Sequence, residues 1–259
     1  MAIQRLPLVP KNVACGSDWY TLIALGDIHF GHTAVDEEGF LKMIGWIRGH
    51  SPTNLGVVLT GDLIENVIPG SKGNMFEMKY PNPEEQIERV LAMLKPISPF
   101  VLMMVDGNHE DRAQRVAGMA VSRRMARELG VPYAGYHGAL DLKLKHGRGN
   151  FIPYLTYVEH GCGAIPKQMS GRYNRLESIQ SMVDADIYIK GHIHHKLAFA
   201  KRVWRKIGGR MVKRKCMFAS NGSYLADAEY AIRMGYEPTE PGVAKLMISS
   251  EEFNIHCSI

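Results

Sequence analysis

The chain has 259 residues, of which 46% are hydrophobic, and its formal net charge at pH 7 is +5. That length suits one large domain or two small ones, and that apolar share is typical of a globular protein with a core. No stretch approaches the about 20 apolar residues that span a bilayer, so we expect no transmembrane segment and no membrane partner. Pro7 and Pro10 interrupt the N-terminal region. They predict a disordered or edge-pairing lead-in rather than a signal peptide.

The cysteines are widely separated and form no C-x-x-C pair, which argues against a zinc ribbon or a redox motif. They are Cys15, Cys162, Cys216 and Cys257. Scattered thiols without a signal peptide suit a reducing compartment, so we predict a cytoplasmic location.

The positive charge is concentrated in one stretch of the chain. Nine Lys or Arg residues and no acid lie between Lys196 and Lys215. Because the net charge of the whole chain is +5, the remaining residues sum to −4. The sequence therefore predicts a local basic patch and not a generally basic protein.

In chain order, the predicted elements alternate between strand and helix before the last third becomes mainly β. Hydrophobic periodicity predicts strands at residues 19–25, 55–60, 100–105, 139–145, 150–158, 186–190, 196–205, 211–219 and 243–256, the last with a break near Ser249. It predicts helices at residues 35–49, 84–95, 113–129 and 172–183. This order favours an α/β (α+β) fold with two packed sheets and outer helices. We expect a single domain, residues 1–259, of which 196–259 form the mainly β C-terminal part.

A long polar stretch, residues 66–83, follows the second predicted strand and contains several Pro and Gly residues. Loops of this length in compact domains are usually functional or disordered. Its place just after Asp62 leaves two readings open, a lid on the substrate side or a surface insertion.

Five of the predicted strands end in Asp, His or Asn, at the position where open α/β sheets place their chemistry. The segments are Gly26-Asp27-Ile28-His29, Gly61-Asp62, Gly107-Asn108-His109-Glu110, Glu159-His160-Gly161 and Gly191-His192-Ile193-His194. Any one of them alone is explained by an ordinary turn, because Asp and Asn commonly cap turns. Their conjunction indicates a metal centre.

The candidate ligands combine carboxylate, amide and imidazole groups, a mixture that suits Mn, Fe, Zn, Co or Ni. They are Asp27, His29, Asp62, Asn108, His160, His192 and His194. Seven ligands exceed the needs of one tetrahedral site and are enough for two metals that share a carboxylate. Two metals about 3.5–4 Å apart are the arrangement used for phosphoryl hydrolysis, with a bridging hydroxide that attacks phosphorus.

In content and order, the five segments resemble the calcineurin-like metallophosphoesterase family. They extend from Gly26 to His194, about two-thirds of the chain. The resemblance implies two packed mixed β-sheets flanked by helices and a dinuclear centre, with manganese favoured. It also implies a phosphoesterase, which we expect to be a phosphodiesterase acting on nucleic acid or nucleotides.

The resemblance also implies a role for each ligand. Asp27, His29 and His194 would hold the first metal, Asp62 would bridge, and Asn108, His160 and His192 would complete the second. Where the family often has Asp three residues after the bridging residue, this chain has Glu65. We expect Glu65 to support the ligands from behind.

Three residues that follow Asn108 are expected to serve catalysis without binding metal. His109 would face the leaving group, as general acid or as a donor to developing negative charge. Glu110 would orient the imidazole of His109. Arg112 would either neutralise a phosphate oxygen or stand solvated at the start of a helix.

A weaker resemblance links two further parts of the chain to phosphoesterases encoded by phage and prophage genomes. The first is the loop at residues 66–73. The second comprises Asn221-Gly222-Ser223-Tyr224 and Gly235-Tyr236-Glu237-Pro238. This resemblance implies work on nucleic acid or nucleotides.

The basic patch reads as a β-hairpin with one interleaved aromatic residue. Lys201, Arg202, Trp204, Arg205 and Lys206 are the candidates for binding DNA or RNA, since cations attract the phosphate backbone and a Trp stacks on bases. The alternative reading is a solvated hairpin that only aids solubility. Two other functions stay open: a small-molecule phosphomonoesterase or cyclic-nucleotide phosphodiesterase, and a catalytically silent binding subunit. The complete ligand set argues against the silent subunit.

Overall fold

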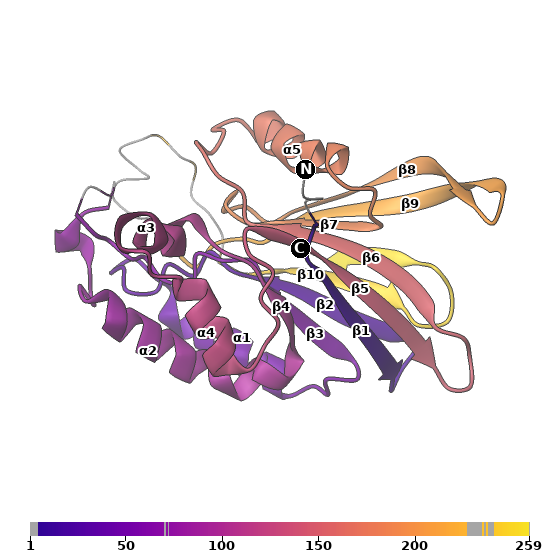
Figure 1. Cartoon of the computed structure of the whole chain (residues 1–259), viewed down its shortest axis with the longest axis horizontal. Coiled ribbons are helices and arrows are strands. Elements are labelled where there is room, and N and C mark those ends of the chain that lie inside the picture. Colours follow the sequence, from indigo (N-terminus) through magenta and orange to yellow (C-terminus); the bar gives the residue numbers. More distant parts are fainter. Residues whose placement is uncertain are drawn as a thin grey trace.

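The structure is a computed structural model that describes residues 5–69, 71, 73–226, 235, 237 and 241–258. Two mixed β-sheets pack face to face, and helices cover their outer faces (Figure 1). This arrangement confirms the predicted fold class.

The larger sheet has six strands in the order β1-β5-β6-β7-β9-β8. They are β1 (Leu8–Cys15), β5 (His137–His146), β6 (Ile152–Glu159), β7 (Ile187–Lys190), β9 (Arg210–Ser220) and β8 (Leu197–Ile207). Strands β6, β7 and β9 are parallel, whereas β5–β6 and β8–β9 are antiparallel hairpins. The carboxyl ends of β6 and β7 therefore lie at the same edge.

The smaller sheet has five strands in the order β11-β10-β2-β3-β4. They are β11 (Ile255–Ser258), β10 (Ala244–Ser249), β2 (Trp19–Leu25), β3 (Leu55–Leu59) and β4 (Val101–Met104). Strands β2, β3 and β4 are parallel to one another. All five residues of β3 are buried, as expected for a central parallel strand covered on both faces.

The facing sides of the sheets form one apolar layer. In β2, Leu22 and Ala24 point toward the six-stranded sheet, where Leu140 and Leu142 of β5 belong to the same cluster. The alternate residues of β2, such as Ile23, point the other way and pack under helices. The period-2 alternation of strand side chains produces this division.

Helices cover both outer faces. The elements over the five-stranded sheet are α1 (Glu37–Arg48), α2 (Pro83–Leu94), η2 (Lys95–Phe100), α3 (Asn108–Ala117) and α4 (Val121–Leu129), with η1 (Met75–Glu77) in the connection before α2. The six-stranded sheet is covered by α5 (Met169–Glu177) and the short turn η3 (Ser178–Ser181), whose Leu176 and Ile179 pack on Tyr188. Within the described residues, no helix is both long and apolar enough to cross a membrane.

Three expectations about elements need correction. The helix predicted at 113–129 begins at Asn108 and is divided, because Gly118 takes the left-handed conformation (φ 69°) and ends α3. The helix predicted at 172–183 is α-helical only to Glu177. The lead-in before residue 19 contains β1, which pairs in parallel with β5 at the sheet edge, so the edge-pairing reading is the correct one.

Candidate metal centre

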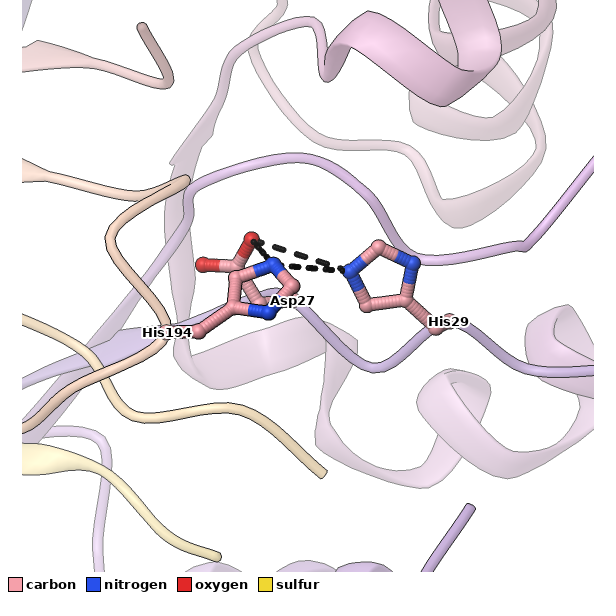
Figure 2. Close-up of side chains that lie close together, drawn as sticks. All are labelled: Asp27, His29 and His194. Atoms are coloured by element: carbon pink, nitrogen blue, oxygen red, sulfur yellow. Dashed lines mark hydrogen bonds and ion pairs between the residues drawn. The ribbon is translucent and has the colours of Figure 1, made fainter. Parts of the chain in front are cut away.

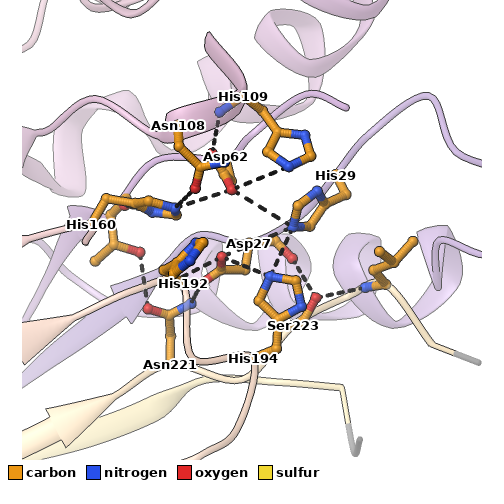
Figure 3. Close-up of polar contacts among 12 residues, drawn as sticks. Asp27, His29, Asp62, Asn108, His109, His160, His192, His194, Asn221 and Ser223 are labelled. Carbon is orange, nitrogen blue, oxygen red and sulfur yellow. Dashed lines mark hydrogen bonds and ion pairs between the residues drawn. The ribbon is translucent and has the colours of Figure 1, made fainter. Parts of the chain in front are cut away.

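The site lies where the carboxyl ends of parallel strands from both sheets meet. Asp27 and His29 follow β2, Asp62 follows β3, and Asn108 begins α3 directly after the β4 turn. From the other sheet, residue 160 follows β6, and residues 192 and 194 follow β7. The structure thus brings all seven predicted ligand residues together around one space (Figure 3).

Two glycines of the motifs allow the loops to approach closely. Gly61 has a φ of +87°, and a Cβ there would lie 2.4 Å from the backbone nitrogen of Gly107. A Cβ on Gly107 would lie 2.0 Å from the backbone nitrogen of Asp62. Any side chain at either position would push Asp62 and Asn108 apart, because both contacts are to backbone atoms.

The first group of ligand atoms contains one carboxylate and two imidazoles (Figure 2). Asp27 Oδ1 lies 3.2 Å from His194 Nε2 and 3.9 Å from His29 Nε2. The two Nε2 atoms of His29 and His194 are 3.1 Å apart. Three ligand atoms that converge in this way can coordinate one divalent ion.

The second group shares the same pattern. It is formed by Asp62, His160 and His192. His160 Nε2 lies 3.0 Å from Asp62 Oδ2 and 3.0 Å from Asn108 Oδ1. The amide oxygen of Asn108 therefore stands beside this group, as the sequence predicts for the second metal.

Asp62 stands between the two groups. Its Oδ2 is 3.9 Å from His29 Nε2 of the first group and 3.0 Å from His160 Nε2 of the second. Its Oδ1 accepts a hydrogen bond from the backbone N–H of His109 (2.8 Å). This position is the one that a bridging carboxylate requires.

The remaining atoms of the imidazoles fit a metal-binding role. His29 Nδ1 is 2.8 Å from Glu65 Oε2, and His160 Nδ1 is 2.7 Å from the carbonyl oxygen of Thr60. A carboxylate or carbonyl partner fixes the proton on Nδ1 and turns the lone pair of Nε2 toward the site, as is usual for metal-ligating histidines. Glu65 thus supports a ligand from behind, as expected from its place in the sequence.

In His192 the roles of the two ring nitrogens are exchanged, with Nε2 as the hydrogen-bond donor and Nδ1 as the nitrogen left for a metal. Its Nε2 lies 2.7 Å from the carbonyl oxygen of Gly163, so it donates there and leaves Nδ1 as an acceptor. Nδ1 of His192 is buried and has no hydrogen-bond partner in the described structure. Orphaned buried acceptors are costly unless a cation occupies the space that they face, so the donor set fits a metal.

The backbone at the site is strained. The non-glycine residues with positive φ in the described chain are Asp27 (48°), His29 (53°), Asp62 (49°), Asn66 (49°), His192 (65°) and His194 (58°). Such conformations cost about 1–3 kcal/mol each and persist only where the surroundings enforce them. Five of these six residues are predicted ligands, and the sixth, Asn66, donates to the carbonyl oxygen of His109 (2.6 Å).

The carboxylates of the site stay ionised despite complete burial. Burial alone would raise the pKa of Asp27, but contact with His194 outweighs it and lowers that pKa to about 2. Burial would lower the pKa of His160, whereas the field of Asp62 and the hydrogen bond with it raise it to about 10, so a metal ion at Nε2 would displace the second proton of this imidazole. The carboxylates therefore create a negative field that favours a bound cation.

His109 is held by Glu65 and Arg112. Its Nδ1 lies 2.7 Å from the Glu65 carbonyl oxygen, and Arg112 Nη2 lies 2.9 Å from its Nε2. A carbonyl only accepts and a guanidinium only donates, so the imidazole is neutral with its proton on Nδ1. Burial agrees with this, since it lowers the pKa of His109 to about 4. A role as proton donor at Nε2 therefore requires Arg112 to turn away and Nε2 to take up a proton first.

Glu110 does not orient His109, contrary to the expectation from sequence. Its buried carboxylate accepts hydrogen bonds from three successive backbone N–H groups, those of Asp62 (3.0 Å), Leu63 (2.6 Å) and Ile64 (3.2 Å). Glu110 thus fixes the loop that carries the bridging carboxylate.

Sequence reasoning missed a second layer around Asp27. Asn221 donates to Asp27 Oδ2 (2.6 Å) and is itself held by Thr60 Oγ1 (3.0 Å), while Ser223 donates to the backbone carbonyl of Asp27 (2.9 Å). Asn221 and Ser223 lie almost 200 residues from Asp27, and no ligand motif marks them. Residues 221–224 were singled out above only for their resemblance to phage phosphoesterases. Of the other residues that carry this resemblance, Gly70, Lys72, Tyr236 and Pro238 lie outside the described part of the chain.

The basic hairpin is divided by its ion pairs. Lys201 lies 2.5 Å from Glu177, and Arg205 lies 2.5 Å from Asp186 and 2.6 Å from Asp184. The other predicted nucleic-acid contacts, Arg202, Trp204 and Lys206, are exposed. The structure therefore separates the five predicted residues into two sets.

Comparison with known sequences places the chain in a family. The sequence profile described as calcineurin-like phosphoesterase matches residues 20–196. The chain belongs to the calcineurin-like phosphoesterase family. The matched segment begins in β2 and ends two residues after His194, so it contains every predicted metal ligand.

Individual relatives of this family member are distant. The DNA polymerase II small subunit of Pyrococcus abyssi is 23% identical over 185 residues, which are 61% of this chain but 28% of that protein. A predicted phosphoesterase from Streptococcus pneumoniae is 13% identical, with a TM-score of 0.40 and coverage of 93% of this chain and 90% of that one. Vps29 from Entamoeba histolytica is 14% identical, with a TM-score of 0.40 and coverage of 92% and 97%.

Proposed function

We propose that the protein is a dinuclear metal-dependent phosphodiesterase that acts on nucleic acid or nucleotides. The observation that carries this proposal is the pair of neighbouring Asp/His groups, with Asp62 of the second group also 3.9 Å from His29 of the first. Asp27, His29 and His194 would hold one divalent ion, and Asn108, His160 and His192 the other. When bound, two such ions supply Lewis acidity to a phosphate oxygen and an activated water as nucleophile.

The residues of the chain prepare the site for an anionic substrate. Arg112 is 18% exposed, and its guanidinium points at His109 Nε2, from where it can turn to a phosphate oxygen. Once Arg112 moves, His109 Nε2 can take up a proton from water, and the imidazolium can then act on the leaving oxygen as a proton donor or as a cationic contact. Glu65 accepts from both residues through its backbone carbonyl and so keeps them side by side.

The choice of diester and of a nucleotide-containing substrate rests on features outside the ligand shell. The exposed cations and Trp204 of the β8–β9 hairpin suit phosphate and base contacts. The polymerase-subunit name of the Pyrococcus abyssi relative agrees with nucleic-acid association. Manganese is the ion we favour, and the cytoplasmic location stays a prediction.

An activity screen of the metal-loaded protein tests the proposal. It compares bis-p-nitrophenyl phosphate, p-nitrophenyl phosphate, single- and double-stranded DNA, RNA and cyclic nucleotides. We expect turnover of the diester to exceed that of the monoester and to disappear in Asp62→Asn. A preference for p-nitrophenyl phosphate or for cyclic nucleotides would instead support the small-molecule alternative. No turnover of any phosphoester by protein with two bound ions would support the silent binding subunit.

A further inference from the structure

The β8–β9 hairpin has two chemically different faces. Its strands pair in an unbroken register from Leu197↔Ser220 to Ile207↔Arg210, so side chains alternate between the faces. One face carries Lys201, Arg205 and Arg214, with the exposed Arg210 at the hairpin tip. The first three of these cations are engaged by acids of neighbouring segments, Lys201 with Glu177, Arg205 with Asp184 and Asp186, and Arg214 with Asp186.

The opposite face, which we call the Trp204 face, presents Arg202, Trp204, Lys206, Met211 and Lys213. At its base lies Lys215, whose ammonium group donates to the backbone carbonyl of Ile255. Trp204 is directly opposite Lys213 in the register, and Lys206 is opposite Met211. The indole of Trp204 is 64% exposed, an unusual state for the largest apolar side chain. Among the described residues, none forms an ion pair with Arg202, Lys206 or Lys213, and all three are exposed.

We propose that the Trp204 face binds single-stranded nucleic acid. Three free cations around one exposed indole can contact successive phosphates while a base stacks on the ring. A duplex hides its base faces, so the indole gives an advantage only with a single strand. Edge protection alone explains lysines on β8, which is an edge strand, but it does not explain an exposed Trp among them.

The Trp204 face lies far from the metal centre, so a ligand that reaches both must be a polymer. β8 begins three residues after His194 and then runs away from the metal centre, and Figure 1 shows the hairpin tip at the opposite end of the molecule from α3. The seven-residue step from Leu197 to Trp204 spans about 23 Å at about 3.3 Å per residue. About seven stacked nucleotides at about 3.4 Å each cover that length. Only a chain of such length reaches both sites, so this inference rests on the proposed function for its catalytic meaning.

Binding is measured on metal-free protein by fluorescence anisotropy of labelled oligothymidine of about 20 nucleotides and of a duplex of equal length. The test variant is Arg202→Ser/Lys206→Ser/Lys213→Ser. The matched control, Lys11→Ser/Lys95→Ser/Arg148→Ser, removes the same charge at exposed positions outside the hairpin. We expect the slope of log K against log salt to become shallower by about 2 in the test variant, about 0.7 per phosphate contact, and to keep its value in the control.

Trp204→Ala tests the stacking part of the proposal. We expect affinity for the single strand to fall about 5- to 150-fold, equivalent to about 1–3 kcal/mol, with rescue by Trp204→Phe and little change on the duplex. Equal losses in the two charge variants would overturn the proposal, because net charge alone would then explain binding. An equal effect of Trp204→Ala on the single strand and the duplex would also overturn it.

The same variants separate this proposal from the catalytic one. Turnover of bis-p-nitrophenyl phosphate by the metal-loaded protein should stay near normal in every hairpin variant, because that substrate is too short to reach the Trp204 face. Binding that depends on the face without any phosphodiester turnover would leave the binding surface standing and refute the phosphodiesterase. Turnover of the diester without binding that depends on the Trp204 face would support the phosphodiesterase and refute the binding surface.

Discussion

The metal centre and the β8–β9 hairpin are both rich in charge, but they are built in opposite ways. At the candidate centre, five of the seven predicted ligand residues are buried, the backbone is strained at five of the seven, and second contacts fix the orientation of the imidazoles. In the hairpin, the backbone is a regular antiparallel ladder, and the cations that acids engage all lie on one face. The proposed metal binding at the centre depends on the identity of each residue. The proposed nucleic-acid binding by the hairpin depends on which cations are left without acidic partners.

This difference predicts how each region responds to substitution. In the centre, single conservative changes should have large and specific effects, because no other side chain takes over the position. In the hairpin, the effect of replacing a cation should depend on whether it lies on the acid-paired face or on the Trp204 face. Four experiments test the contrast, beginning with the largest expected effect.

Asp62→Asn should abolish turnover and lower metal content while leaving the fold intact. Asn has nearly the same shape but cannot supply the negative charge shared by both ligand groups. Metal analysis, circular dichroism and the bis-p-nitrophenyl phosphate assay measure the three effects. Two full equivalents of metal together with a normal rate would refute the bridging assignment.

His109→Ala should lower kcat by roughly 10²–10⁴ without loss of metal, because His109 contacts the substrate side and is not an assigned ligand. If its Nε2 protonates the leaving group, the loss should shrink for a good leaving group such as p-nitrophenol. Comparison of diesters with good and poor leaving groups checks this. Equal losses for both would argue against proton donation and in favour of positioning, as its contact with Arg112 allows.

Glu65→Gln should weaken binding of the first metal by about 10–100-fold, the usual effect of removing a carboxylate behind a ligating histidine. Glu77→Gln is the matched control, since Glu77 contacts His32, which is not a ligand (3.2 Å). Calorimetric titration with Mn²⁺ measures both variants. If the two affinities fall equally, the support that Glu65 gives to His29 is unimportant.

Within the hairpin, Arg205→Ser should lower the free energy of unfolding by about 1–3 kcal/mol, because it leaves the carboxylate of Asp186 without its main partner. Arg202→Ser should change it by less than about 0.5 kcal/mol, since Arg202 lies on the Trp204 face and is exposed. Urea unfolding compares them. Equal stabilities would remove the distinction between the two faces.

How well the sequence predicted each region depends on how far apart in the chain the contacting residues lie. Strand ends were visible as apolar runs that stop at Asp, Asn or His, and parallel pairing then forces those ends together. Asn221 and Ser223 were not visible, because their contacts with Asp27 arise only from folding. The strand β1 was not predicted as a strand, since only two of its eight residues are buried.

The hairpin shows the same limit. Its alternation is readable from sequence, and so are the two faces. The acids that engage Lys201 and Arg205 belong to α5 and to the segment before β7, and nothing in the hairpin itself reveals them. A count of positive charge therefore overestimates the binding surface.

The central claim is that two divalent ions bind to one chain and that both are needed for hydrolysis. The most direct test adds Mn²⁺ in steps to metal-free protein and follows bound metal and bis-p-nitrophenyl phosphate turnover in the same samples. We predict that turnover rises to a plateau at two equivalents per chain. A plateau at one equivalent, or no turnover with two equivalents bound, would contradict the claim.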